Sequence, residues 1–231
     1  MQTIIKIISL KNNGERNTVR IRTILYGGAF NMPHIGHRSA AGQTLDYMAM
    51  ADGYEELWFL PCSSNAFGVK KSVSTEHVVK MLELMVNEMR DPRFSVCVDE
   101  LETMNGAGPY AVVKELIKKY PERKFCYLIG SDQANSIRSW RNSRKLVMTI
   151  PFVTIRRIGK PNWYSTCWYY DKQHVYINDP PTKKQVSSSG IQNDINANWD
   201  KFKTRGHEHL PHSVFRYIVA NELYKKPNST A

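Results

Sequence analysis

The segment VRIRTILYGGAFNMPHIGH, residues 19–37, constrains the fold of this 231-residue chain more than any other part. Its first half alternates in polarity and ends in two glycines, which is typical of a strand that runs into a tight turn. Gly27 and Gly28 let the backbone turn and approach a ligand closely. His34 and His37 then stand at the start of a helix, where free backbone N–H groups and the helix dipole favour an anion. A strand, a glycine turn and a helix in this order predict a phosphate-binding unit.

Strands and helices alternate along the rest of the chain. The apolar patterns predict strands at 56–61, 93–98, 124–132, 150–157 and 174–179, and helices at 74–90, 109–120, 133–148 and 211–224. This order predicts an α/β fold with a single Rossmann-like open parallel sheet and helices on both faces. The strands that end at Gly28 and Gly130 should reach the same rim of the sheet, where ligands collect. We expect one domain over residues 19–226, an N-terminal extension at 1–18 and a C-terminal tail at 227–231.

Composition narrows the class of protein. Hydrophobic residues make up 42% and charged residues 23% of the chain, which excludes a mainly disordered protein. The mean hydropathy is −0.46, and no run of about 18 apolar residues occurs, so no membrane span is expected. The opening MQTIIKIISLKNNGER is a poor secretory signal, so we expect a cytoplasmic location.

The charge balance indicates an anionic partner. Lys and Arg number 32 and Asp and Glu number 21, which gives a net charge of +11. Such a charge suits nucleic acid, a membrane surface or a small polyphosphate. Charge alone does not decide among these partners. Because no RNP-like aromatic motif or zinc finger accompanies it, we expect small-molecule substrates more than nucleic acid, and no membrane partner is expected. The widely separated cysteines lack a CxxC pair and predict reduced, buried thiols: Cys62, Cys97, Cys126 and Cys167.

Two further patterns bear on chemistry. The chain lacks GxGxxG and GxxxxGK[ST], which argues against a dinucleotide oxidoreductase and a P-loop nucleotidase. His207, His209 and His212 form an HxHxxH string, but no acidic or cysteine partner is patterned nearby. We therefore expect solvated histidines there and no protein-bound metal site.

The string HIGH at 34–37 resembles the signature of the nucleotidylyltransferase superfamily, which includes the class I aminoacyl-tRNA synthetases. The longer string GGAFNMPHIGH is similar to the GGxFDPxHxGH opening of the nicotinate/nicotinamide mononucleotide adenylyltransferases, with Asn31 in the place of the family's Asp. Later segments resemble that family in the right order. They are FGVKK (67–71), LIGSDQANSIRSW (128–140), FVTIRRIG (152–159), VSSSGIQNDI (186–195) and LPHSVFRYIVANELY (210–224).

The resemblance implies three sets of site residues. His34, His37 and Lys71 would stabilise the transferring phosphate. ATP would be bound by Gly27, Gly28, Ala29, Phe30, His34, His37, Gly130, Asp132, Ser187, Ser188, Ser189 and Gln192, the last in the place of the family's Arg. The mononucleotide would be bound by Phe30, Asn31, Lys70, Tyr110, Trp140 and Arg157. Mg²⁺ would travel on ATP, coordinated largely by water.

The function implied is adenylyl transfer from ATP to nicotinate or nicotinamide mononucleotide, which yields deamido-NAD or NAD and pyrophosphate. Phosphopantetheine adenylyltransferases and cytidylyltransferases share the same motif and stay as alternatives. A class I synthetase fragment fits HIGH but lacks the KMSKS lysine. A basic nucleic-acid-binding module without catalysis is the alternative from another class. The choice between acid and amide on the pyridine ring stays open, as does homo-oligomer formation.

Overall fold

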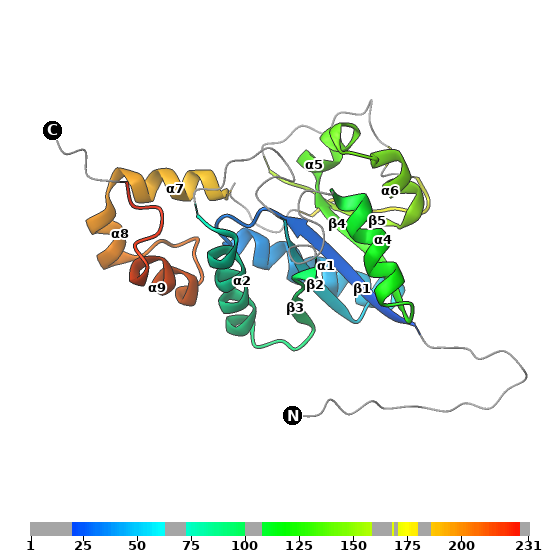
Figure 1. Ribbon diagram of the computed structural model, residues 1–231, viewed down its shortest axis with the longest axis horizontal. Helices are drawn as coiled ribbons and strands as arrows, with labels where there is room; N and C mark the ends of the chain where they lie inside the picture. The colour runs from blue at the N-terminus through cyan, green and yellow to red at the C-terminus, as the bar shows by residue number, and fades with distance from the viewer. Residues whose placement is uncertain are drawn as a thin grey trace, which may run out of the picture.

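A computed structural model describes residues 20–62, 73–99, 108–158, 168, 171–179 and 186–226 (Figure 1). The predicted extension at 1–18 and tail at 227–231 lie outside these ranges, so both domain boundaries stay predictions. Lys70, Lys71 and Cys167 lie outside the described residues as well. Cys62 and Cys126 are buried, and Cys97 is half-buried.

Six parallel strands form the sheet in the described part of the chain. They are β1 (Ile21–Gly28), β2 (Glu56–Pro61), β3 (Phe94–Val96), β4 (Arg123–Gly130), β5 (Phe152–Ile155) and β6 (Val175–Ile177). Their spatial order is β3-β2-β1-β4-β5-β6, and every neighbouring pair is parallel. The order reverses between β1 and β4, which places a ligand crevice at their carboxyl ends. The open parallel sheet predicted from the alternation of elements is confirmed, and Gly28 and Gly130 lie on one rim.

Helices cover both faces of this sheet (Figure 1). They are α1 (Ile35–Asp52), α2 (Thr75–Met89), α4 (Pro109–Lys119), α5 (Ser131–Ser136), α6 (Ser143–Thr149), α7 (Ser188–Ala197), α8 (Trp199–Arg205) and α9 (His212–Ala220). Side chains of α1, α2, α7, α8 and α9 share one core with the sheet, and those of α4, α5 and α6 share the other. Neighbouring strand residues divide between the cores, as Ile24 and Leu25 do, because side chains alternate across a strand. In the described ranges, no helix is both long and apolar enough for a membrane span.

Two helical assignments needed the tertiary structure. The prediction of one continuous helix that ends near Met148 is wrong. The chain forms α5, a 3₁₀ turn at Ile137–Ser139 and α6, with Asn142 at φ 58° between the turn and α6. Helix α8 was not anticipated, although its ends carry sequence signals. The Asn198 side chain accepts the Lys201 N–H at 2.8 Å, and Gly206 follows the last turn.

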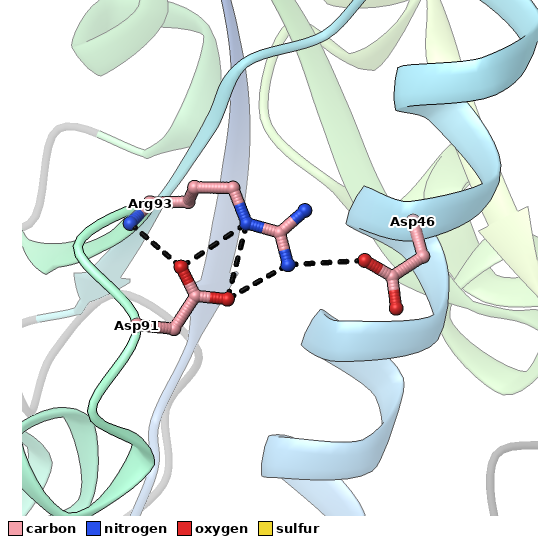
Figure 2. A network of polar contacts seen from close by, with 3 residues as sticks. All are labelled: Asp46, Asp91 and Arg93. Carbon is pink, nitrogen blue, oxygen red and sulfur yellow. Dashed lines mark hydrogen bonds and ion pairs between the residues drawn. The ribbon is translucent and has the colours of Figure 1, made fainter.

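A polar network fastens the α2–β3 connection to α1 (Figure 2). Asp91 accepts the backbone N–H of Arg93 at 3.0 Å and the Arg93 Nη2 at 2.7 Å. The same Nη2 lies 3.1 Å from Asp46 Oδ1 on α1. Hydrogen bonds from Arg93 lower the pKa of Asp91. These groups are partly exposed, so their contribution to stability is small, and their role is to fix geometry.

Helix α9 begins against a carboxylate from α2. Glu88 accepts the N–H of His212 at 3.3 Å and that of Ser213 at 2.7 Å, and Arg38 lies 3.7 Å from it. Burial alone would raise the pKa of Glu88, but the hydrogen bonds from Ser213 and His212 and the charge of Arg38 lower it. A carboxylate at a helix N-terminus satisfies unpaired N–H groups and the helix dipole.

The Glu88→Ala variant should therefore lose about 1–2 kcal/mol of unfolding free energy, because the first N–H groups of α9 lose their acceptor. Glu83→Ala is the matched control, since Glu83 lies on the same helix and its carboxylate lies 3.4 Å from Lys80 Nζ in an exposed ion pair. It should change stability by less than about 0.5 kcal/mol. Urea denaturation of the three proteins measures the difference, and equal losses would contradict this role of Glu88.

Candidate active site

Two stacked histidines cap the N-terminus of α1. His34 is the N-cap residue, and its Nδ1 accepts the N–H of Gly36 at 3.1 Å. His37 returns the bond, because its Nδ1 accepts the N–H of His34 at 3.3 Å. The ring centroids lie 3.8 Å apart at an angle of 22°. The HIGH string thus forms a reciprocal capping box made of imidazoles instead of the usual hydroxyl and carboxyl groups.

These bonds set the protonation of both rings. A neutral imidazole that accepts at Nδ1 carries its hydrogen on Nε2. Burial lowers the pKa of His34 to about 3, helped by the charges of Arg157 and His209. Burial also holds the pKa of His37 well below its ordinary value, with further effects from His34 and Arg157. Both side chains are therefore neutral at pH 7, and each has an Nε2–H to donate.

The first N–H groups of α1 are already engaged. Ile35 donates to the His209 carbonyl at 3.0 Å, and Gly36 donates to His34 Nδ1 at 3.1 Å. His37 donates to the His34 carbonyl at 2.9 Å. The expectation that free N–H groups of this helix face an anion is therefore wrong. Imidazole Nε2–H groups are the donors that this helix end offers.

Packing explains why positions 27 and 36 of the motif have no side chain. A Cβ on Gly36 would lie 2.9 Å from atoms of the buried His34 ring. A Cβ on Gly27 would collide with the hydroxyl of Tyr127 on the neighbouring strand β4. Both positions therefore require the close approach that only glycine allows.

The predicted ATP-binding residues of the first loop occupy two environments. Gly27 and Gly28 end β1 on the ligand rim, followed by the half-buried Ala29. The Phe30 side chain is only 2% exposed, with its ring centroid 5.0 Å from that of His37 and 5.7 Å from that of Phe59. Its ring belongs to the core, so only its backbone faces the rim.

At the end of β4, Gly130 leads into Asp132, whose Oδ2 lies 3.3 Å from Arg157 Nη1. The Arg157 Nη2 also donates to the Val186 carbonyl at 3.3 Å, and its backbone N–H donates to Ser131 Oγ at 3.0 Å. The buried Asp132 Oδ1 has no hydrogen-bond partner among the described residues. An acceptor predicted to bind ATP and a guanidinium predicted to bind the mononucleotide thus lie side by side on the rim.

Two of the three serines at the start of α7 form hydrogen bonds within the protein. Ser187 Oγ accepts the N–H of Gly190 at 3.1 Å and caps the helix. Ser188 Oγ donates to the Met32 carbonyl at 2.9 Å, whereas Ser189 is exposed. Gln192 donates its amide to the carbonyl of Asn31 at 3.0 Å.

Tyr110 and Trp140, predicted for the mononucleotide, are half-buried on the face covered by α4, α5 and α6. The Trp140 ring stands edge-on to Tyr127, with a centroid distance of 6.4 Å. Their contact with a ligand stays a prediction, as do those of Lys70 and Lys71.

The HxHxxH string departs from expectation. The His207 side chain is 13% exposed, and its Nε2 lies 3.1 Å from Asp194 of α7. The His209 side chain is 21% exposed, so only His212 is a solvated histidine. The acidic partner of His207 comes from another element and could not be found by local spacing, whereas His209 Nε2 lies 3.4 Å from the adjacent Glu208, which the expectation of no acidic partner overlooked. No group of three or more metal-ligating side chains occurs within the described ranges.

Sequence reasoning missed three side chains at the rim. Tyr26 lies near Asp132 and Arg157, and burial raises its pKa to about 12. Ser131 accepts from Arg157, and Tyr224 donates to Asn31 Oδ1 at 2.6 Å. Ser131 and Tyr224 lie within segments that resemble the family. The sequence therefore marked their positions, but it did not identify their hydrogen-bond partners.

Comparison with known proteins agrees with this geometry. The model of the cytidylyltransferase-like family matches residues 25–193. A probable nicotinate-nucleotide adenylyltransferase of Bacillus mycoides is 32% identical over 204 residues, which cover 87% of this chain and 97% of that protein. A protein of the same name from Methylacidiphilum infernorum is 25% identical over 93% of this chain and 97% of its own.

A solved structure has the same fold. Plasmodium falciparum nicotinic acid mononucleotide adenylyltransferase complexed with NaAD gives a TM-score of 0.67 at 21% identity, over 88% of this chain and 97% of that one. The fold and the histidine-capped helix define a nucleotidyltransferase enzyme. Within that class, the chain belongs to the cytidylyltransferase-like family and to its nicotinate-nucleotide adenylyltransferase members.

The two glycines of α1 should respond oppositely to alanine. Gly36→Ala should cost about 1–3 kcal/mol and lower activity, because its Cβ would push the His34 ring out of the cap. Gly42→Ala should stabilise by up to about 1 kcal/mol, since nothing lies within 4 Å of its Cβ and alanine favours helix. Thermal or urea unfolding tests both, and destabilisation of equal size would contradict the steric account.

Stability should fall as the pH drops from 7 to 5. Unfolded histidines take up protons below about pH 6.5, whereas the folded rings stay neutral, so protons favour the unfolded chain. His34 contributes up to about 2 kcal/mol over this range, and His37 and the buried His174, whose pKa values burial also lowers, act in the same direction. His34→Asn keeps an N-cap acceptor but cannot titrate, so its pH slope should be shallower than that of the parent protein. Urea unfolding at pH 5, 6 and 7 measures it, and equal slopes would refute the prediction.

Proposed function

We propose that this enzyme transfers the adenylyl group of ATP to nicotinate mononucleotide and releases pyrophosphate. The observation that carries the proposal is the pair of neutral, stacked histidines, His34 buried and His37 half-buried, whose Nδ1 atoms are used by the helix cap so that each Nε2 carries the hydrogen. The names of the most similar relatives support the nicotinate substrate. Membership of this enzyme family sets aside the synthetase fragment and the non-catalytic nucleic-acid-binding module.

The reaction needs alignment and charge stabilisation more than proton transfer. An anionic oxygen of the mononucleotide 5′-phosphate attacks the α-phosphorus of ATP, a new P–O bond forms, and the bond to the β-phosphate breaks. Pyrophosphate leaves with the bond electrons. Neutral imidazoles can donate hydrogen bonds to the phosphate oxygens without giving up a proton, and preorganised donors in a dry site stabilise growing charge strongly.

The neighbouring groups take complementary parts. The Arg157 guanidinium supplies positive charge, and Asp132, whose Oδ1 has no hydrogen-bond partner among the described residues, supplies an acceptor for a ribose hydroxyl. Lys70 or Lys71, which precede α2 in the sequence, would add charge. Mg²⁺ arrives with the substrate as MgATP, where phosphate and water oxygens provide its preferred ligands. A cytoplasmic location and any homo-oligomer stay predictions.

His37→Gln tests the histidine pair directly. Glutamine at the third helical position preserves a capping acceptor, but it removes the imidazole donor. We expect kcat to fall about 100-fold. The control is His212→Gln, because His212 is exposed and its side chain caps nothing.

Pyrophosphate release from MgATP is measured with nicotinate mononucleotide and, separately, with nicotinamide mononucleotide. A higher kcat/KM with the nicotinate substrate, lost in His37→Gln and kept in His212→Gln, is the expected result. Absence of turnover with both mononucleotides would overturn the proposal, and phosphopantetheine and CTP-dependent reactions would then be assayed.

A further inference from the structure

The loop between β1 and α1 is held from outside by the C-terminal part of the chain. Ser188 Oγ donates to the Met32 carbonyl at 2.9 Å. Gln192 Nε2 donates to the Asn31 carbonyl at 3.0 Å, and the Tyr224 hydroxyl donates to Asn31 Oδ1 at 2.6 Å. These partners stand 156, 161 and 193 residues apart in sequence, so the fold alone brings them together.

Asn31 accepts hydrogen bonds at its backbone carbonyl oxygen and at its side-chain Oδ1. Tyr224 is only 9% exposed, and burial raises the pKa of its hydroxyl, which keeps it a donor at neutral pH. Asn31 directly follows Phe30, whose ring packs on His37 at a centroid distance of 5.0 Å. A displacement of Asn31 would therefore move the Phe30 ring and, through it, the histidine pair.

Two roles for Gln192 can be compared. The family resemblance puts a phosphate ligand at this position, but a neutral amide lacks the positive charge and the bidentate fork with which an arginine would bind a triphosphate. One N–H of its amide is instead donated to the Asn31 carbonyl. The geometry favours a brace for the loop over a phosphate ligand.

We propose that Tyr224 and Gln192 are positioning residues, which hold Asn31 from two sides and thereby fix the His34–His37 pair against the transferring phosphate. The proposal rests on the proposed function for its catalytic consequence, but the contact itself is independent of the substrate. Neither side chain needs to touch a reacting atom. Misplacement of catalytic groups by about 1 Å is enough to slow a reaction greatly.

Tyr224→Phe is the first test, with Tyr217→Phe as the matched control. The Tyr217 hydroxyl lies 2.9 Å from His77 Nδ1, at the contact between α9 and α2. Each variant therefore removes one hydroxyl and one hydrogen bond, but only Tyr224 contacts the loop. We expect Tyr224→Phe to lower kcat at least about tenfold with the KM for MgATP changed less than about threefold, and Tyr217→Phe to stay within about twofold.

Gln192→Leu separates a brace from a phosphate ligand. A brace predicts a loss in kcat similar to that of Tyr224→Phe, whereas a ligand predicts a raised KM for MgATP. Because both residues act on Asn31, the double variant should lose less than the product of the two single losses. A raised KM with unchanged kcat would overturn the proposal for Gln192.

Hydrogen exchange of the amides from residue 31 to residue 38 provides a readout that needs no activity. We expect faster exchange there in Tyr224→Phe and unchanged exchange in Tyr217→Phe. Unchanged exchange in Tyr224→Phe, or faster exchange with unchanged kcat, would overturn the proposal. If the parent enzyme transfers no adenylyl group, the proposed function fails, while the exchange comparison still decides whether Tyr224 holds the loop.

Discussion

The reciprocal cap between His34 and His37 is the interaction on which the site depends. The Nδ1 of each ring accepts a hydrogen bond from a backbone N–H. The same bonds that begin α1 therefore also orient both Nε2–H groups. The His34 ring, which accepts the Gly36 N–H, leaves no room for a side chain at Gly36. One local arrangement therefore determines the helix start, the tautomer of both histidines and the residue between them.

The cap gives the site neutral donors, so its positive charge has to come from elsewhere. Arg157 supplies it at the rim, held by Asp132, the Val186 carbonyl and Ser131. Burial lowers the pKa of both histidines, and the guanidinium lowers it further, so both rings stay uncharged beside it. The chain's net charge of +11 then serves to attract anionic substrates, while the two histidine rings supply hydrogen-bond donors of fixed orientation.

The C-terminal helices complete the site although they lie outside the sheet. Helix α9 is anchored to α2 through Glu88, and α7 and the residues after α9 reach back to the loop at Asn31. The backbone carbonyls of Asn31 and Met32 are thereby satisfied, as buried polar groups require. A nucleotide-binding rim formed by β1 and β4 thus depends on contacts from the last quarter of the chain.

The sequence by itself determined the alternation of elements, the rim at Gly28 and Gly130 and the family, because strand periodicity, glycine turns and a helix-starting motif are local properties. Only the tertiary structure decided which polar groups meet. It buried Phe30 in the core, brought Asp194 to His207 and joined Gln192 to Asn31 across 161 residues. Such pairings depend on how distant elements pack, and the energies that select them are spread over the whole fold.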